Sequence, residues 1–341
     1  MLSIFAVSFF SVLKIFLVCL CGAWLSRRGV FTKEFRQQLS QVILWLMLPC
    51  LLVSKLSVSV NPANLKAWSA LPLTALVYIG LGFTFGGIAM LLVRPPADER
   101  RVLTAACTFG NSGYIPFPLV IALASTAPIF ANDPEAAGRG IAYISVYLVA
   151  MSPCLWGIGF PFLSGRPVRS LRWQQILSPP VISILVSIAL GTIPPLRSLV
   201  VETGAPLRIL LDSASLIGQA AIPCALFLVG ASLADIRMSN EGAALPTLGA
   251  LFWVRQILMP LAGVLITVTL WRLRLIPHDP MCALVLMIQA SVPPATNLVV
   301  MCQVHNRGTQ AMSHLILVTY LAAVPMLTIW IAFFLWVVGN L

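Results

Sequence analysis

Charged residues are scarce in this sequence. They make up 9% of its 341 residues, whereas ordinary soluble domains carry about 25%. Hydrophobic residues make up 59%, the mean hydropathy is +0.97, and no stretch resembles a separate soluble domain. This composition is that of an integral membrane protein. The net charge of +11 is typical of basic loops on a cytoplasmic membrane face, so we expect no nucleic-acid partner.

Motifs of the common enzyme classes are also missing. The sequence has no P-loop, no HExxH and no CxxC, so we expect neither an ATP-driven pump nor a cofactor or metal site. The pattern GNSG, at Gly110–Gly113, matches the GxSG of rhomboid intramembrane serine proteases, in which Ser112 would be the nucleophile. The chain has too many predicted spans for that class and no histidine at mid-span. The protease therefore remains a remote alternative.

Apolar runs of about 20 residues, the length that crosses a bilayer as a helix, recur along the chain. We predict ten spans, at residues 4–25, 38–57, 68–93, 102–126, 140–163, 175–194, 209–233, 244–271, 280–303 and 310–338. The odd-numbered loops carry 12 Lys and Arg residues and the even-numbered loops carry 7. The positive-inside rule then places the odd loops in the cytoplasm and both termini on the other side.

The two halves of the chain share a spacing. LPCLL, with Pro49, and IPCAL, with Pro223, lie 174 residues apart, and Pro116 and Pro293 lie 177 apart. We therefore predict two five-helix repeats in one membrane domain. They cover residues 1–165 and 166–341. Because five is odd, the second repeat enters the membrane upside down, which is a frequent plan of secondary transporters.

Spans 4 and 9 carry helix-breaking residues at their centres. The segments are GNSGYIP, with Asn111, and SVPPATN, with Asn297. Proline removes a backbone N–H, and the groups that it frees are tolerated in a membrane only inside protein or beside a watery cavity. Two independent kinks would be the simpler interpretation. Paired breaks in corresponding positions instead indicate a transport site, where helix N-terminal ends favour an anion.

Several motifs resemble the PIN-LIKES proteins of the auxin efflux carrier superfamily. They include FGNSGYIPFPLV, DSASLIGQAAIPCALFLVGASL, VRQILMP and QASVPPATN. The resemblance implies two inverted five-helix repeats whose spans 4 and 9 cross beside the substrate. It also implies transport of indole-3-acetic acid or a related organic anion, in the endoplasmic reticulum membrane or, as an alternative, the plasma membrane. Asn111 and Asn297 would flank the substrate carboxylate.

The candidate site residues fall into three groups. Substrate-binding candidates are Asn111, Ser112, Tyr114, Gln289, Ser291 and Asn297. Residues expected to shape the crossing are Gly110, Gly113, Pro116, Pro293 and Pro294. Candidates for charge or proton coupling are Asp212 and Arg255. Hydrogen bonds between helices are the alternative role of the polar groups, and a helix cap is the favoured role of Asp212. Arg255 would either attract an anion or pair with a carboxylate, or else snorkel or contact loop carbonyls.

These observations predict a secondary transporter that works by alternating access. Spans 1, 2, 6 and 7 would form a scaffold, and spans 3–5 and 8–10 would carry the site across, a division that the resemblance suggests. The alternatives are a proton- or sodium-coupled carrier of a different organic anion, and a receptor or scaffold without transport. The expected partners are the organic anion, membrane lipid and a second copy of the chain in a homodimer.

Overall fold

The structure is a computed structural model that describes residues 2–165, 179–234, 243–305 and 307–341. Within these residues the regular structure is helical, apart from an isolated β-bridge between Gly110 and Pro294. Seven helical segments are long and apolar enough to cross a membrane, or eight if one sharply bent pair counts as a span. The predicted class, an all-α integral membrane protein, is confirmed.

Helices occupy all ten predicted segments. In the first half they are α1 (Leu2–Arg27), α2 (Lys33–Val42), η1 (Ile43–Met47), α3 (Leu48–Ser59), α4 (Pro62–Trp68), α5 (Ala70–Val93), α6 (Glu99–Thr108), α7 (Pro116–Thr126), η2 (Pro128–Phe130), α8 (Ala136–Cys154), η3 (Leu155–Gly159) and α9 (Phe160–Ser164). In the second half they are α11 (Pro179–Thr192), α12 (Pro194–Leu196), η5 (Arg197–Val201), α13 (Arg208–Gln219), α14 (Ala221–Ala234), α15 (Leu245–Phe252), η6 (Trp253–Leu258), α16 (Met259–Arg272), α17 (Pro280–Ser291), α18 (Asn297–His305) and α19 (Thr309–Val338). Four of the basic loop residues counted above lie outside the described residues: Arg166, Arg169, Arg172 and Arg237.

Prolines explain the local irregularities of these spans. The wide π-type turns η1, η3 and η6 each end two residues before a proline, at Pro49, Pro161 and Pro260. A proline lacks the N–H that would bond four residues back, and a wider turn keeps the remaining backbone groups paired. The carbonyl of Gln256, four residues before Pro260, accepts a hydrogen bond of 2.7 Å from the indole N–H of Trp330.

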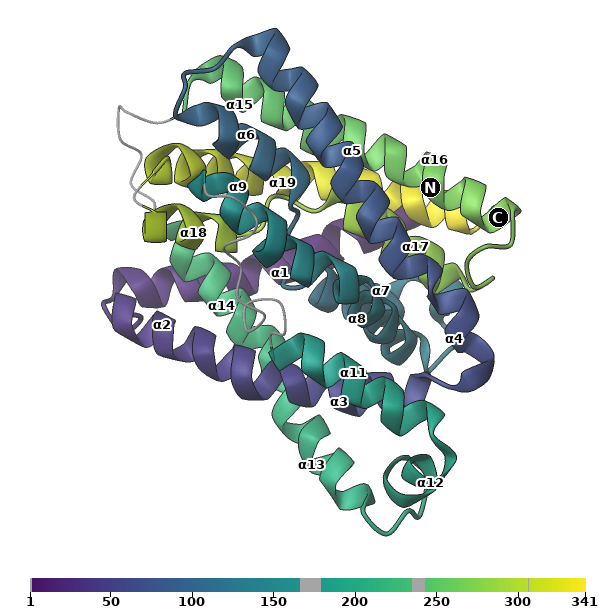
Figure 1. Ribbon diagram of the computed structural model, residues 1–341. Helices are drawn as coiled ribbons and strands as arrows, with labels where there is room; N and C mark the ends of the chain where they lie inside the picture. Colours follow the sequence, from purple (N-terminus) through teal and green to yellow (C-terminus); the bar gives the residue numbers. More distant parts are fainter. Residues whose placement is uncertain (1, 166–178, 235–242, 306) are drawn as a thin grey trace.

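The helices form two groups that are visible in Figure 1. In one group α1 packs against α14, while α3 packs against α11 and α13. In the other, α5 packs against α6 and α8, and α16 packs against α17. Glycines permit the closest approaches in the first group, because a Cβ on Gly22 would overlap the backbone of Phe227 and one on Gly230 would overlap the backbone of Cys19.

Candidate functional site

Two helices are interrupted at their centres, and the two interruptions contact each other. The first lies between α6, which ends at Thr108, and α7; the second lies between α17, which ends at Ser291, and α18. The Asn111 N–H donates to the Pro293 carbonyl at 2.8 Å, and the Ala295 N–H donates to the Phe109 carbonyl at 2.9 Å. Backbone groups that each break frees are therefore satisfied by the other break. We call this paired segment, residues 109–115 with 292–296, the crossing.

The prolines of the crossing sit where their missing N–H costs least. Pro116 occupies the first turn of α7, a position whose N–H has no partner within a helix. Pro294 forms the bridge with Gly110, and Pro293 contributes its carbonyl to the pairing. Pro293 and Pro294 thus lie within the crossing, and Pro116 lies directly after it, at the start of α7.

The two asparagines differ in what their side chains contact. The Asn111 amide is buried, donates to the Tyr320 hydroxyl at 2.6 Å and accepts from the Tyr114 N–H at 3.0 Å. Asn297 is the first residue of α18, is half-buried, and makes no side-chain hydrogen bond to the described residues. Asn111 therefore anchors the crossing to α19, whereas no described residue pairs with the Asn297 amide.

The remaining polar candidates serve mainly internal contacts. Gln289 Nε2 donates to the Ser112 carbonyl at 3.0 Å, which links α17 to the first interruption. The Ser112 hydroxyl bonds to the Gly110 carbonyl at 3.3 Å. The Ser291 hydroxyl bonds to the Ile288 carbonyl of its own helix at 2.9 Å. Of these groups, the Oε1 atom of Gln289 is buried without a hydrogen-bond partner.

Arg255 lies against the crossing and does not snorkel. Its side chain is 1% exposed, and its guanidinium donates to the carbonyls of Val292 and, at 3.4 Å, of Cys107. A structural contact with loop carbonyls was expected, and the acceptors are instead carbonyls at the two helix ends; no carboxylate pairs with Arg255 among the described residues. Snorkelling is wrong because the residue is on a wide turn that faces the protein interior.

Asp212 is not a helix cap. It lies in the second turn of α13, whose N-cap position is Leu207. Its side chain is 60% exposed and pairs with Arg208 at 3.2 Å, one turn earlier on the same helix. The predicted cap fails because α13 begins four residues before Asp212, which leaves this carboxylate no free helix N–H to accept.

Two small cavities adjoin the crossing. One lies between the crossing and the first helix group, and is lined by Ile43, Leu48, Leu51, Gly113, Tyr114, Phe117, Pro118, Ala221, Ile222 and Ala225. The other lies behind the crossing, and is lined by Tyr78, Ile79, Thr108, Gly110, Ser112, Tyr147, Met151, Arg255, Met259 and Gln289. Each has a free volume of about 10 Å³, close to what one water molecule needs. The first is apolar and the second is polar.

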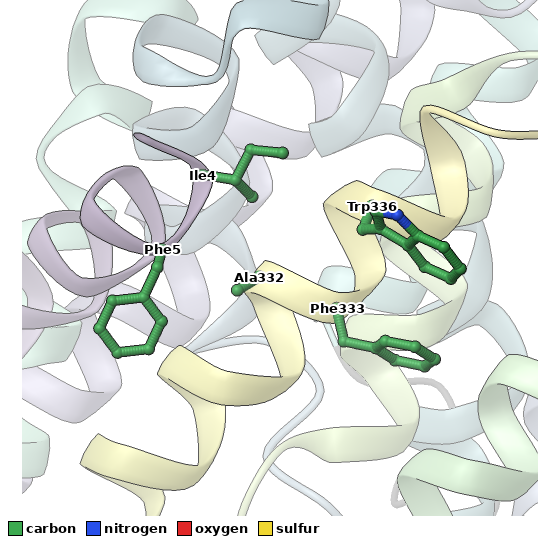
Figure 2. Close-up of a pocket in the computed structure, with 5 residues that line it drawn as sticks. All are labelled: Ile4, Phe5, Ala332, Phe333 and Trp336. Atoms are coloured by element: carbon green, nitrogen blue, oxygen red, sulfur yellow. The ribbon is translucent and has the colours of Figure 1, made fainter. Parts of the chain in front are cut away.

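A larger cavity lies elsewhere, away from the crossing. Figure 2 shows this groove of about 360 Å³ between α1 and α19, lined by Ile4, Phe5, Ala332, Phe333 and Trp336. Its walls are apolar, and Phe5 and Trp336 are among the exposed large hydrophobic residues. The groove offers no polar group that would orient a substrate, apart from the indole N–H of Trp336.

An ionic cluster at the start of α17 was not foreseen. Asp279 caps α17 by accepting from the Met281 N–H at 3.0 Å, pairs with Arg139 at 2.8 Å and accepts from the Tyr143 hydroxyl at 2.8 Å. Arg139 also pairs with Asp133 and holds the pKa of that carboxyl below its usual value. Tyr143 and Tyr320 lie 177 residues apart, the same spacing as Pro116 and Pro293. This spacing supports the predicted repeat but does not indicate the hydrogen-bond partners of either tyrosine.

Comparison with known proteins identifies the family. The family described as "Membrane transport protein" matches residues 7–167 and 165–331. Protein PIN-LIKES 3 of Arabidopsis thaliana is 26% identical over 388 residues, which cover 99% of each chain. Protein PIN-LIKES 5 of the same plant is 27% identical over 394 residues, 98% of each chain. An uncharacterized transporter of Saccharomyces cerevisiae, YBR287W, is 28% identical over 180 residues, 50% of this chain.

These matches confirm the resemblance drawn from the motifs, and they concern transporters rather than an enzyme class. The serine protease suggested by GNSG is therefore wrong. In the structure, the Ser112 hydroxyl bonds to a backbone carbonyl of the crossing. The chain belongs to the membrane transport protein family, and it is similar to the PIN-LIKES proteins over nearly its whole length.

Proposed function

We propose that the protein is a secondary transporter of a small organic anion and that the anion binds at the crossing. The observation that carries this proposal is the pairing of two interrupted helices by backbone hydrogen bonds, with the half-buried amide of Asn297 unpartnered beside it. Such a pairing places four half-helix ends near one point. A transporter gains from this arrangement because helix ends carry charge without titratable groups.

The charges at the crossing favour an anion. The C-terminal ends of α6 and α17 face Arg255, which occupies their partial negative charge. The N-terminal ends of α7 and α18 carry roughly half a positive charge each. No acidic residue occurs in either interruption, residues 109–115 and 292–296, to neutralise them. A carboxylate between these ends and the Asn297 amide would be stabilised by both.

The apolar lining of the cavity next to the crossing matches the chemistry of an aromatic substrate body, although the cavity itself is only water-sized in this structure. Tyr114 and Phe117 line it on one side, while Ile43, Leu51 and Ala225 line it from the first helix group. The resemblance to auxin efflux carriers favours indole-3-acetic acid or a related aromatic carboxylate. We propose that the carboxylate contacts Asn297 and that the ring enters this cavity, which widens when the two helix groups separate.

Recurring contacts support the proposed inverted repeat of residues 1–165 and 166–341. The packing of α1 against α14 corresponds to that of α11 against α3, and the packing of α5 against α6 corresponds to that of α16 against α17. We propose that α1, α3, α11, α13 and α14 belong to the scaffold and that the other helix group moves with the crossing. The endoplasmic reticulum membrane and non-cytoplasmic termini remain part of this proposal.

The function is tested by flux in proteoliposomes that contain the purified protein. We expect saturable uptake of labelled indole-3-acetic acid, competition by other aromatic carboxylates, and no competition by the cation tryptamine. The apolar ring is the same in tryptamine, so the comparison isolates the charge. Competition by tryptamine equal to that of the acids would contradict an anion site. Specific binding without any flux would favour the receptor alternative.

A further inference from the structure

Arg255 has an unusual environment for a charged side chain inside a membrane protein. It is the largest of the fully buried side chains among the described residues. Its hydrogen bonds go to two backbone carbonyls, and no carboxylate pairs with it in the described part of the chain. A buried charge without compensation is expensive, so the carbonyls must supply what an acidic partner would normally supply.

The two carbonyls come from opposite halves of the chain and from equivalent places. Cys107 lies in the last turn of α6, and Val292 is the C-cap residue of α17. Each helix C-terminus carries about half a negative charge, so two such ends amount to about one. The single positive charge of the guanidinium therefore balances the pair. The planar donor group of arginine also reaches two acceptors at once, which a lysine ammonium does less well.

The crossing is shaped around this side chain. A Cβ added to Gly110 would overlap Arg255 Nη2 and would lie 2.9 Å from Val292 Cγ2. Glycine at position 110 is thus what lets the guanidinium enter. The polar cavity behind the crossing contains two unpaired buried atoms, the donor Arg255 Nε and the acceptor Gln289 Oε1. Its free volume of about 10 Å³ is close to what one water molecule needs beside the charge.

We propose that the guanidinium of Arg255 is the resident cation of the crossing. It occupies the carbonyl-lined position between two half-helix C-terminal ends, where a carrier that couples to a metal ion would hold that ion. Arg255 is in this sense a positioning residue, which fixes α6 against α17 without a metal ion. This inference concerns the crossing itself and stands apart from the identity of the substrate.

The consequence is that a protein without this side chain has a vacant cation site. Replacement by alanine removes the charge and leaves the carbonyls of Cys107 and Val292 facing an empty space. Free guanidinium has the shape and donors of the lost group, and Na⁺ is accepted by carbonyl oxygens at broken helices. Both should bind Arg255→Ala and neither should bind the crossing of the unaltered protein.

The test is the melting temperature of purified protein in detergent, which does not depend on transport. We expect Arg255→Ala to melt more than about 5 °C lower than the unaltered protein, because two buried acceptors lose their donors. Low millimolar guanidinium chloride should restore part of this loss in a saturable way, with NaCl and choline chloride compared at equal ionic strength. The matched control, Arg272→Met at the exposed end of α16, should neither lose stability nor respond.

Two results would overturn the inference. One is equal stabilisation of Arg255→Ala, the control and the unaltered protein by guanidinium. The other is Arg255→Met melting as high as or higher than Arg255→Lys, since methionine keeps much of the volume and lysine keeps the charge. The second comparison still decides the matter if Arg255→Ala does not fold. Because neither result involves flux, a failed transport assay would not affect this test.

Discussion

Gly110 shows most clearly how a single residue determines the crossing. Its missing side chain is the space that Arg255 Nη2 occupies, and its backbone forms the bridge with Pro294. We predict that Gly110→Ala destabilises the protein by about 1–3 kcal/mol through overpacking. Gly87→Ala on α5, where a Cβ would meet nothing within 4 Å, is the matched control. Thermal melting of both variants measures the difference.

The cause of the destabilisation by Gly110→Ala can also be tested. If the clash with Arg255 produces the loss, Gly110→Ala should cost less in protein that already carries Arg255→Ala. A double-mutant cycle of melting temperatures measures this coupling, which we expect to be at least about 0.5 kcal/mol. Additive costs would show that the two positions act independently and would leave Val292 as the cause of any destabilisation.

Both Asn111 and Asn297 were predicted to contact the substrate carboxylate, whereas in the structure only Asn111 makes side-chain hydrogen bonds to the described residues. Asn111 donates to Tyr320 and accepts from the Tyr114 N–H, so its amide is a structural group. We predict that Tyr320→Phe, which removes that hydroxyl, lowers stability by about 1 kcal/mol. The variant should leave the KM of transport within about twofold of the original value. A large rise in KM at unchanged stability would instead place Tyr320 at the substrate.

At the scale of helices, Asp279 fixes the start of α17. It caps the helix and pairs with Arg139, which belongs to the first half of the chain. We predict that Asp279→Ala loosens the first turn of α17 and exposes Cys282, whose side chain is fully buried. Maleimide labelling of Cys282, read by peptide mass spectrometry, should accelerate at least about tenfold. Glu135→Ala, in the adjacent loop and without an ion pair among the described residues, is the control.

The helices were predictable from the sequence where the signal is local. Apolar runs gave the ten segments, and the prolines of GNSGYIP and SVPPATN gave the two interruptions. The chain also bends by 95° between Thr192 and Pro194, where the prediction ended span 6. The bend lies at the Pro194–Pro195 pair, which was an available but unused signal.

Contacts between distant segments could not be read from the sequence. The acceptors of Arg255 lie 148 and 37 residues away along the chain, and the partner of Asn111 lies 209 residues away. A periodic sequence pattern indicates which face of a helix is apolar, but it does not indicate which distant residue will form a hydrogen bond with a side chain on that face. The failed cap at Asp212 has a local origin, because Asp and Ser favour helix starts, whereas the helix begins four residues earlier, at Arg208.

At the scale of the whole molecule, the two halves are packed unequally. The helix α3 packs against α8, and α1 packs against α7. In the proposed repeat, the counterpart of the α3–α8 pair is α14 with α19, and the counterpart of the α1–α7 pair is α11 with α18. Neither counterpart shows comparable packing among the described residues. Among the described residues, which leave out 166–178 and 235–242 in two odd-numbered loops, the two helix groups are therefore in closer contact at the end of the even-numbered loops.

This inequality predicts different reactivity for two cysteines at matching positions. Cys50 lies on α3, which packs against α8, and Cys224 lies on α14, which shows no comparable packing against α19 among the described residues; both cysteines are half-buried. We predict that a polar maleimide labels Cys224 faster than Cys50 in proteoliposomes, and that saturating substrate changes the ratio of the two rates. A ratio that substrate leaves unchanged would contradict movement of one helix group against the other.

The most direct test of the central claim is the KM for uptake of labelled indole-3-acetic acid in Asn297→Ala. A hydrogen bond to a charged carboxylate is worth about 1.5–3 kcal/mol, so KM should rise about tenfold or more. Asn340→Ala, the same change at the exposed C-terminal end of the chain, should transport normally. If the unaltered protein carries the acid and Asn297→Ala carries it with the same KM, the carboxylate does not bind at the crossing as proposed.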